Sequence, residues 1–345
     1  MSQALLSLGA KIYGCLTGIR TVLYNVGVLR SYRSSLPVIS IGNITAGGNG
    51  KTPLCLYVAS ECAARGMRPA ILSRGYGGSE RGPYRVDATD SPQRVGDEPL
   101  LMARTGVAPV YIARARAQGA RQIEKDQSAD IIILDDGFQH RALARQVDIV
   151  SVFAGTERAI EDFVAGKLLP EGLFRESRDA ALRRASMIVI SERKVMRDSD
   201  ALAPIDERLL KVLPPGVPVY RSFFEVVGVT HMVTGKPIEP GVVQAFAAIA
   251  NPETFFESLE HLGFSLVAKR SYADHYVFTE ADIASMLQEH PDSVLICTSK
   301  DAVKLEGLPA AMKDRCGVLQ VRARVSPGDA FMVQMQRRIL SGKSR

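Results

Sequence analysis

The stretch "NITAGGNGKT" (residues 43–52) decides the fold of this chain. Its end matches the phosphate-binding pattern G-x-x-x-x-G-K-[ST] at Gly50, Lys51 and Thr52, but Thr45 stands where the first glycine is expected. The apolar run "PVISIG" precedes the stretch, and "TPLCLYVASECAARG", a segment of helical length, follows it. Because the pattern requires a strand before the loop and a helix after it, we expect a P-loop here rather than a chance glycine-rich turn.

The residues of this loop suit the binding of phosphate. Gly47, Gly48 and Gly50 permit φ > 0, so the chain can turn its N–H groups toward phosphate oxygens. The N-terminus of the following helix adds partial positive charge. We expect Lys51 to contact the β- and γ-phosphates and the Thr52 hydroxyl to bind Mg²⁺. The predicted nucleotide contacts are Thr45, Ala46, Gly47, Gly48, Asn49, Gly50, Lys51 and Thr52.

A second motif, "IIILDDGFQ" (131–139), follows the Walker B pattern, in which a buried strand ends in a carboxylate beside the phosphate loop. Asp135 is therefore expected to hold Mg²⁺ directly or through water. Together with the P-loop, this motif indicates nucleoside triphosphate chemistry. The N-K-x-D element that reads guanine is absent from the sequence, which argues against a GTPase.

Mostly continuous apolar runs recur along the first half of the chain, with stretches of helical length between them. They lie at 37–43, 68–73, 108–113, 129–136, 147–153 and 186–191. Continuous apolar runs are typical of strands covered on both faces. The alternation predicts an α/β fold of the P-loop NTPase type: a doubly wound, mostly parallel sheet with a second, smaller α/β domain.

The length of 345 residues exceeds what one hydrophobic core usually reaches, so we expect more than one domain. From about residue 213 the chain contains more turn residues, and the run "PVYRSFFEVVGV" indicates a connector with a hairpin or a pair of strands. The predicted organisation is an N-terminal amphipathic, membrane-associating segment at 1–36, a P-loop domain at 37–220, a two-stranded linker at 221–240 and a smaller α/β domain at 241–345.

Composition excludes several classes of protein. With 46% hydrophobic and 23% charged residues the chain is expected to be globular rather than disordered. Its five cysteines are scattered without metal-ligand spacing, which indicates buried or free thiols in a reducing, cytosolic compartment. The cysteines are Cys15, Cys55, Cys62, Cys297 and Cys316.

The N-terminal segment has no acidic residue before Glu61, although the net charge is only +6. Apolar residues at spacings of four and three place one face of a helix along it. They are Ile12, Leu16, Ile19, Leu23 and Val26. The uncharged runs are shorter than the about 20 apolar residues that span a bilayer. A helix lying on anionic lipid, a helix packed on its own domain and a secretory signal are the three interpretations, and the composition favours the first.

Eight motifs, in this order, resemble those of the tetraacyldisaccharide 4'-kinase family, the lipid A 4'-kinases of Gram-negative bacteria. They are "GNITAGGNGKTP", "LSRGYGG", "VGDEPLLMA", "ILDDGFQH", "LLPEGLFRE", "ANPETFF", "DHYVFT" and "TSKDAVKL", between about residues 36 and 305. In that family Ser or Thr commonly opens the P-loop, which makes Thr45 ordinary. The family's "GIGNP" reads "AIANP" here, with Ala248 and Ala250 in place of glycines.

The resemblance implies a specific reaction and setting. It implies transfer of the γ-phosphoryl group of ATP, with Mg²⁺, to the 4'-hydroxyl of an acylated glucosamine disaccharide 1-phosphate, giving lipid IVA. It also implies a kinase domain and a smaller domain joined by a two-stranded linker, with the active site in the cleft between them. The expected partners are the lipid substrate and the cytoplasmic face of the bacterial inner membrane, with no nucleic acid and no obligate protein partner.

The resemblance also implies roles for individual residues. Asp97 of "GDEP" would be the base for the sugar hydroxyl, working with His275 of "DHY". Glu98, Asp135 and Gln139 would belong to the Mg²⁺ or water shell. The candidate substrate contacts are Arg74, Asp136, His140 and Arg175.

The residues alone leave alternatives open. Asp97 also suits a helix N-cap, and His275 also suits a solvated loop. Arg114 and Arg116 are further cations for substrate or ATP. Two other functions fit the P-loop: a nucleotide-hydrolysing switch or chaperone, and a soluble kinase for a small sugar.

Overall fold

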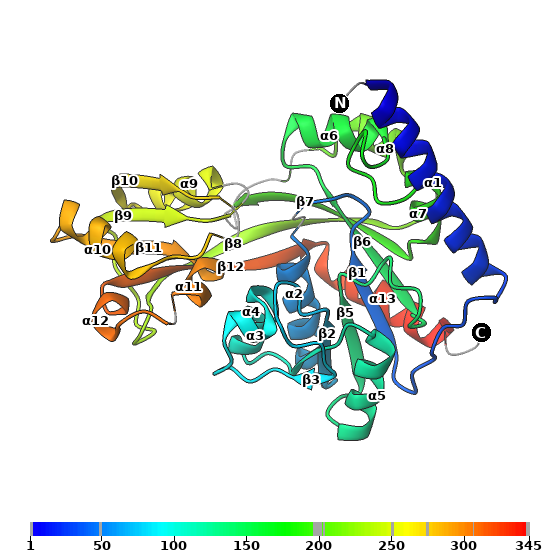
Figure 1. The fold of residues 1–345 in the computed structure, drawn as a ribbon, viewed down its shortest axis with the longest axis horizontal. Helices are drawn as coiled ribbons and strands as arrows, with labels where there is room; N and C mark the ends of the chain where they lie inside the picture. Colours follow the sequence, from blue (N-terminus) through cyan, green and yellow to red (C-terminus); the bar gives the residue numbers. More distant parts are fainter. Residues whose placement is uncertain are drawn as a thin grey trace.

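The structure is a computed structural model that describes residues 3–47, 50–195, 202, 204–249, 252–273, 276–305 and 307–342. Within these residues the strands form one twelve-stranded sheet in the order β10-β9-β11-β12-β8-β7-β6-β1-β5-β2-β4-β3 (Figure 1). The strands are β1 Val38–Gly42, β2 Pro69–Ser73, β3 Tyr84–Arg85, β4 Val110–Ile112, β5 Ile131–Asp135, β6 Val147–Phe153, β7 Met187–Val195, β8 Val219–His231, β9 Val242–Ala247, β10 Ser265–Ser271, β11 Val294–Thr298 and β12 Cys316–Ser326.

Helices cover this sheet and fill the connections between its strands (Figure 1). In chain order they are α1 Gln3–Asn25, α2 Lys51–Ala64, α3 Pro92–Val95, α4 Asp97–Arg104, α5 Arg116–Asp126, α6 Glu157–Ala165, α7 Arg178–Arg184, α8 Glu207–Val212, α9 Glu253–His261, α10 Glu280–Glu289, α11 Ser299–Lys304, α12 Ala310–Lys313 and α13 Gly328–Gly342.

β1 is the central strand from which the first parallel strands extend to both sides. It pairs in parallel with β5 on one side and β6 on the other, with Ile39 opposite both Ile133 and Val147. β2 and β4 lie beyond β5, and β7 lies beyond β6. The carboxyl ends of β1, β5, β2 and β4 therefore meet at one edge, where ligands bind in sheets of this kind. All six predicted strands are present, and the predicted mostly parallel α/β fold is confirmed.

The strands are apolar on both faces because helices pack on both faces. On one face Ile39, Ile71 and Ile133 pack with α2, α4 and α13. On the other face Val38 and Leu72 pack with α5, and the neighbouring β6 and β7 pack with α6, α7 and α8. This two-sided burial explains why the sequence shows continuous apolar runs instead of alternation.

The strands fall into two groups along the sheet: a first group, β1 to β7, and a second group, β9, β10 and β11. Two long strands, β8 and β12, join these groups, as Figure 1 shows. β8 continues the first group by pairing in parallel with β7, and it pairs antiparallel with β12 from Arg221 to His231. β12 in turn pairs in parallel with β11. The second strand of this pair therefore comes from residues 316–326, outside the predicted linker at 221–240.

The last helix returns to the first group of strands. Phe331, Met332 and Met335 of α13 are fully buried in the same core cluster as β1 and α2. The end of the predicted C-terminal domain thus packs on the P-loop half of the molecule. The domain boundaries themselves stay a prediction.

α1 packs on the molecule by one face and exposes another. Its packed face carries small residues: a Cβ on Gly9 would lie 3.3 Å from Pro170, and one on Gly14 would lie 2.7 Å from Leu168. The exposed face carries large apolar side chains, each more than half exposed. They are Leu5, Leu8, Ile12, Leu16, Ile19, Val22 and Val26. Leu23, predicted on this face, is partly covered, and Val22 takes its place.

No helix among the described residues is long and apolar enough to cross a membrane.

Candidate active site

The P-loop connects the carboxyl end of β1 to the first residue of α2, as the sequence predicts. Gly50 is the N-cap of α2 with φ 71°, and a Cβ there would lie 2.9 Å from Ser191 Oγ. Glycine is therefore required at this position by both its backbone angle and its surroundings. Gly48 and Asn49 lie outside the described residues, so their predicted phosphate contacts stay predictions.

The start of the P-loop is held by the segment that carries Arg175. Thr45 forms a β-bridge with Phe174, and Ala46 N–H donates to Leu173 C=O at 2.8 Å. Arg175 N–H donates to Ile44 C=O at 2.9 Å. Thr45 thus occupies an extended, strand-like position, where a side chain is accommodated and the usual glycine is unnecessary.

Lys51 and Arg175 converge on Asp136. Lys51 Nζ lies 3.5 Å from Asp136 Oδ1, and Arg175 Nη1 lies 3.3 Å from Asp136 Oδ2. Asp136 has φ 46°, a left-handed angle that is uncommon for a residue with a side chain. The backbone strain at this residue marks the end of β5 as a functional site. Two cations and one carboxylate leave net positive charge for phosphate oxygens.

Asp135 is buried at the end of β5, beside α2. Ser73 Oγ donates to its Oδ2 at 2.8 Å, and Cys55 Sγ lies 3.6 Å from its Oδ1. Burial, with the negative fields of Glu98 and Asp136, raises the pKa of Asp135 from 3.8 to about 6. Because desolvation is the main cause, a cation bound beside Asp135 would stabilise its charged form.

The donor set of this site fits Mg²⁺. Thr52 and Asp135, with Glu98 and Asp136 nearby, offer hydroxyl and carboxylate oxygens, the ligands that Mg²⁺ prefers. Asp136 Oδ1 is buried and accepts no hydrogen bond from the described residues. No cluster of three or more His, Cys, Asp and Glu side chains suited to a metal occurs in the part of the chain described. Mg²⁺ usually binds through one or two carboxylates and completes its shell with water and substrate phosphate oxygens, which the donors Thr52 and Asp135 permit.

Asp97 and Glu98 open helix α4 and are both partly buried. The N-cap of α4 is Gly96, so the alternative that Asp97 serves as the N-cap is wrong. The field of Glu98 acts on Asp135, which places this carboxylate near the Walker B strand. His275 lies outside the described residues, and its pairing with Asp97 stays a prediction.

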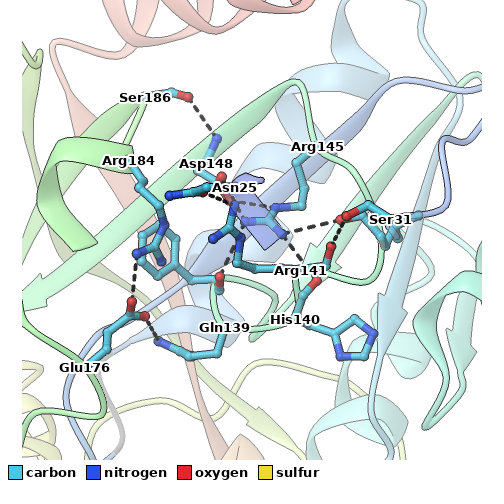
Figure 2. Close-up of polar contacts among 12 residues, drawn as sticks. Asn25, Ser31, Gln139, His140, Arg141, Arg145, Asp148, Glu176, Arg184 and Ser186 are labelled. Atoms are coloured by element: carbon cyan, nitrogen blue, oxygen red, sulfur yellow. Dashed lines mark hydrogen bonds and ion pairs between the residues drawn. The ribbon is translucent and has the colours of Figure 1, made fainter. Parts of the chain in front are cut away.

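Gln139 bridges the start of the P-loop and the segment that carries Arg175; Figure 2 shows its contact with Glu176 in that segment. Its Nε2 donates to Asn43 C=O at 2.7 Å and to Glu176 Oε1 at 3.2 Å. Glu176 accepts a second bond, from Arg184 Nη1 at 2.8 Å. The amide nitrogen of Gln139 is thus used within the protein, and its role in the Mg²⁺ shell stays a prediction.

His140, which is partly buried, and Arg116, which is buried, are basic groups near the site. Burial, reinforced by surrounding arginines led by Arg116, lowers the pKa of His140 from 6.5 to about 4. Burial also lowers the pKa of Arg116 to about 10. The Arg116 Nε is buried and makes no hydrogen bond to the described residues. An unsatisfied buried guanidinium nitrogen suits an anion that is added later. Arg74 and Arg114, by contrast, are exposed.

An arginine-lined pocket adjoins these residues beneath α1. It is small, with a cavity volume of about 30 Å³, and it is open to solvent. Its lining residues are Thr17, Arg20, Thr21, Gln139, Arg141, Arg175, Glu176 and Arg184. Sequence reasoning had missed Arg20, Arg141, Glu176 and Arg184. Two of these residues lie in motifs that the sequence shows: Arg141 in "FQHR", directly after the Walker B motif, and Glu176 in "GLFRE", the segment that pairs with the P-loop.

Arg141 joins this pocket to α1. It donates to Thr21 C=O at 3.0 Å and to Asn25 Oδ1 at 2.8 Å (Figure 2). Its guanidinium also lies 5.2 Å from the centre of the Tyr24 ring. The N-terminal helix is therefore fastened to the loop that follows the Walker B motif.

Comparison with known proteins gives one consistent family. The chain matches the family described as tetraacyldisaccharide-1-P 4'-kinase over residues 2–340. The tetraacyldisaccharide 4'-kinase of Aeromonas hydrophila is 37% identical over 299 residues, which cover 86% of this chain and 81% of that protein. The tetraacyldisaccharide 4'-kinase of Rhodospirillum rubrum is 37% identical over 311 residues, covering 89% of this chain and 87% of that protein.

A solved structure agrees with the sequence relatives. It is the crystal structure of the "apo" form of LpxK from Aquifex aeolicus in complex with ATP. It matches with a TM-score of 0.76 and 25% identity, covering 98% of this chain and 100% of that chain. The chain therefore belongs to the tetraacyldisaccharide-1-P 4'-kinase family and is a kinase, a phosphotransferase acting on a hydroxyl group.

Proposed function

We propose that this protein transfers the γ-phosphoryl group of ATP to the 4'-hydroxyl of a tetraacyldisaccharide 1-phosphate at a membrane surface, giving lipid IVA. The observation that carries this proposal is the convergence of Lys51, Asp135 and Asp136 at the mouth of the P-loop. Family membership supports the lipid substrate. The nucleotide-hydrolysing switch and the soluble sugar kinase are not favoured.

The site residues divide the work of phosphoryl transfer. Lys51 and the P-loop N–H groups hold the phosphates, and Thr52 and Asp135 would hold the Mg²⁺ ion, which would neutralise phosphate charge. Asp97 accepts the proton of the sugar hydroxyl as the new P–O bond forms, with His275 orienting it. Arg116 and His140 flank the same edge, where Arg116 supplies a fixed positive charge and His140 stays neutral at pH 7.

The substrate approaches from the side of α1. Four arginines line the small pocket beneath α1, and guanidinium groups suit the phosphate group of a phosphorylated sugar at its opening. The exposed apolar face of α1 suits the acyl region of a membrane, and Lys11 and Arg20 lie on opposite edges of that face. This arrangement supports peripheral binding at the cytoplasmic face of a bacterial inner membrane.

Transfer of labelled γ-phosphate to the tetraacyldisaccharide 1-phosphate in detergent micelles tests the reaction and its base together. Asp97→Asn should lower kcat about a hundredfold or more, because the amide cannot accept the proton. ATP binding and the thermal midpoint should not change. Lys51→Ala should abolish transfer.

Asp329→Asn is the matched control, since Asp329 also lies in the first helical turn of its helix and its side chain is 99% exposed. It should keep wild-type turnover. Full turnover in Asp97→Asn would refute the base assignment, and free phosphate without labelled lipid would favour the switch.

A further inference from the structure

Three of the sequence motifs, "AIANP", "DHYVFT" and "TSKDAVKL", meet at one buried lysine in the second group of strands. Lys304 of "TSKDAVKL" has its Nζ 2.9 Å from Asp301 Oδ1 and donates to Ala248 C=O at 3.4 Å. The same Nζ lies 5.9 Å from the centre of the Phe278 ring. One side chain thus contacts the helix α11, the end of β9 and the segment before α10.

Asp301 also bonds to Ala248, through the backbone N–H group. It is fully buried, and its Oδ2 accepts from Ala248 N–H at 3.1 Å and from Thr298 Oγ1 at 2.7 Å. Both backbone groups of Ala248 are therefore bonded to the ion pair. Ser299 Oγ also donates to Leu319 C=O at 3.0 Å, which fastens α11 to β12.

Stability alone does not account for this pair. The side chains of Lys304 and Asp301 are 4% and 0% exposed. Removing two charges from water costs as much as their attraction returns, and well-packed apolar residues of similar volume often give equal or greater stability. What apolar residues cannot supply is the directed set of bonds that fixes α11 on Ala248.

The opposite face of α11 packs on the helix that carries Asp97. Val303 is 2% exposed and lies in the core cluster that contains Leu100 and Met102 of α4. α11 and α4 are in contact along this face. α11 is thus packed between the second group of strands and α4, whose first residues are Asp97 and Glu98.

We propose that Asp301 and Lys304 are a positioning pair that fixes α11 and so sets where α4 presents Asp97 and Glu98 to the reacting atoms. This inference rests on the proposed role of Asp97. It predicts that loss of the pair lowers turnover and leaves ATP affinity unchanged, because Lys51 and Thr52 lie on α2.

The double variant Asp301→Leu/Lys304→Met tests the proposal, since it exchanges the pair for apolar side chains without stranding a charge. The expected result is an unchanged KM for ATP and a kcat lower by about tenfold or more. The thermal midpoint should fall, because Ala248 N–H and Thr298 Oγ1 lose their buried acceptor. Gln244→Met is the control: Gln244 is buried in the same half and bonds Met286 C=O and Ser293 Oγ, away from α11. Wild-type kcat in the double variant, or an equal loss in Gln244→Met, overturns the proposal.

Two further variants keep the outcomes distinct. If the double variant does not fold, Val303→Ala is measured instead, because it loosens the contact between α11 and α4 and keeps the ion pair intact. A lower kcat at unchanged KM for ATP supports the proposal. An unchanged kcat overturns it. Asp97→Asn is measured in parallel. Full turnover in Asp97→Asn removes the proposed function of that carboxylate, whereas a loss there with full turnover in the double variant removes only the positioning pair.

Discussion

At the scale of single residues, burial at the nucleotide edge changes two pKa values in opposite senses. Asp135 has its pKa raised to about 6, so its contribution to stability is present below pH 3.8 and lost as pH rises through about 6. His140 has its pKa lowered to about 4, so its contribution is present above pH 6.5 and lost as pH falls through about 4. Both groups are disfavoured in their charged forms for the same reason, desolvation.

Asp135→Asn should therefore stabilise the protein at neutral pH while abolishing transfer. In the absence of Mg²⁺ we expect the free energy of unfolding at pH 7 to rise by on the order of 2–3 kcal/mol, because a buried charge is removed. At pH 4 the two proteins should differ little. Urea denaturation between pH 4 and 7 measures this. A wild type and variant whose stabilities differ by the same amount at every pH would contradict the assignment.

At the scale of elements, α1 combines two roles that the sequence left as alternatives. Its small residues pack on the segment at Leu168 and Pro170, and its large apolar residues face outward. Packing and the proposed lipid docking are therefore compatible, because a different face of the helix is available for each.

Replacing Ile12, Leu16 and Ile19 with Ser should weaken binding to vesicles of anionic phospholipid and leave the thermal midpoint nearly unchanged, since these side chains are already more than half exposed. Cys15 is the exposed cysteine among the five and lies on the same helix, so an environment-sensitive dye attached there reports insertion.

The matched control for this helix is Val333→Ser/Leu340→Ser, which changes exposed apolar residues of α13. Vesicle binding should be retained in the control. Equal binding by wild type and the α1 variant would show that the face does not contact lipid.

At the scale of the whole molecule, the β8–β12 pair carries the chain between its two groups of strands. A register shift interrupts this pair between Gln320 and Val321, opposite Gly228 and Val226. Gly228 has φ 142°, and a Cβ there would meet nothing within 4 Å. Backbone angle, not space, is what requires glycine at this bulge.

Gly228→Ala should accordingly lower the free energy of unfolding by about 1 kcal/mol through backbone strain. Gly18→Ala is the comparison: it also has nothing within 4 Å, but it lies inside helix α1, where Ala should stabilise by about 0.5–1 kcal/mol. Chemical denaturation of both variants measures the two changes. A neutral or stabilising Gly228→Ala would show that the bulge tolerates a side chain.

The sequence by itself determined the P-loop, the Walker B strand and the places in the chain of the first parallel strands. These features depend on residues close together in the chain: glycines that permit a turn, a strand of continuous apolar residues, and a Lys-Thr pair at a helix start. The eight ordered motifs also identified the family correctly.

Only the tertiary structure decided which distant residues meet. Arg141 and Arg184 line the pocket beneath α1, Glu176 joins Gln139, and β12 rather than a local hairpin pairs with β8. α13 packs in the core cluster that contains β1 and α2. α11 lies between Ala248, which bonds to Asp301, and α4. Contacts of this kind depend on packing between segments far apart in sequence, and no local spacing specifies them.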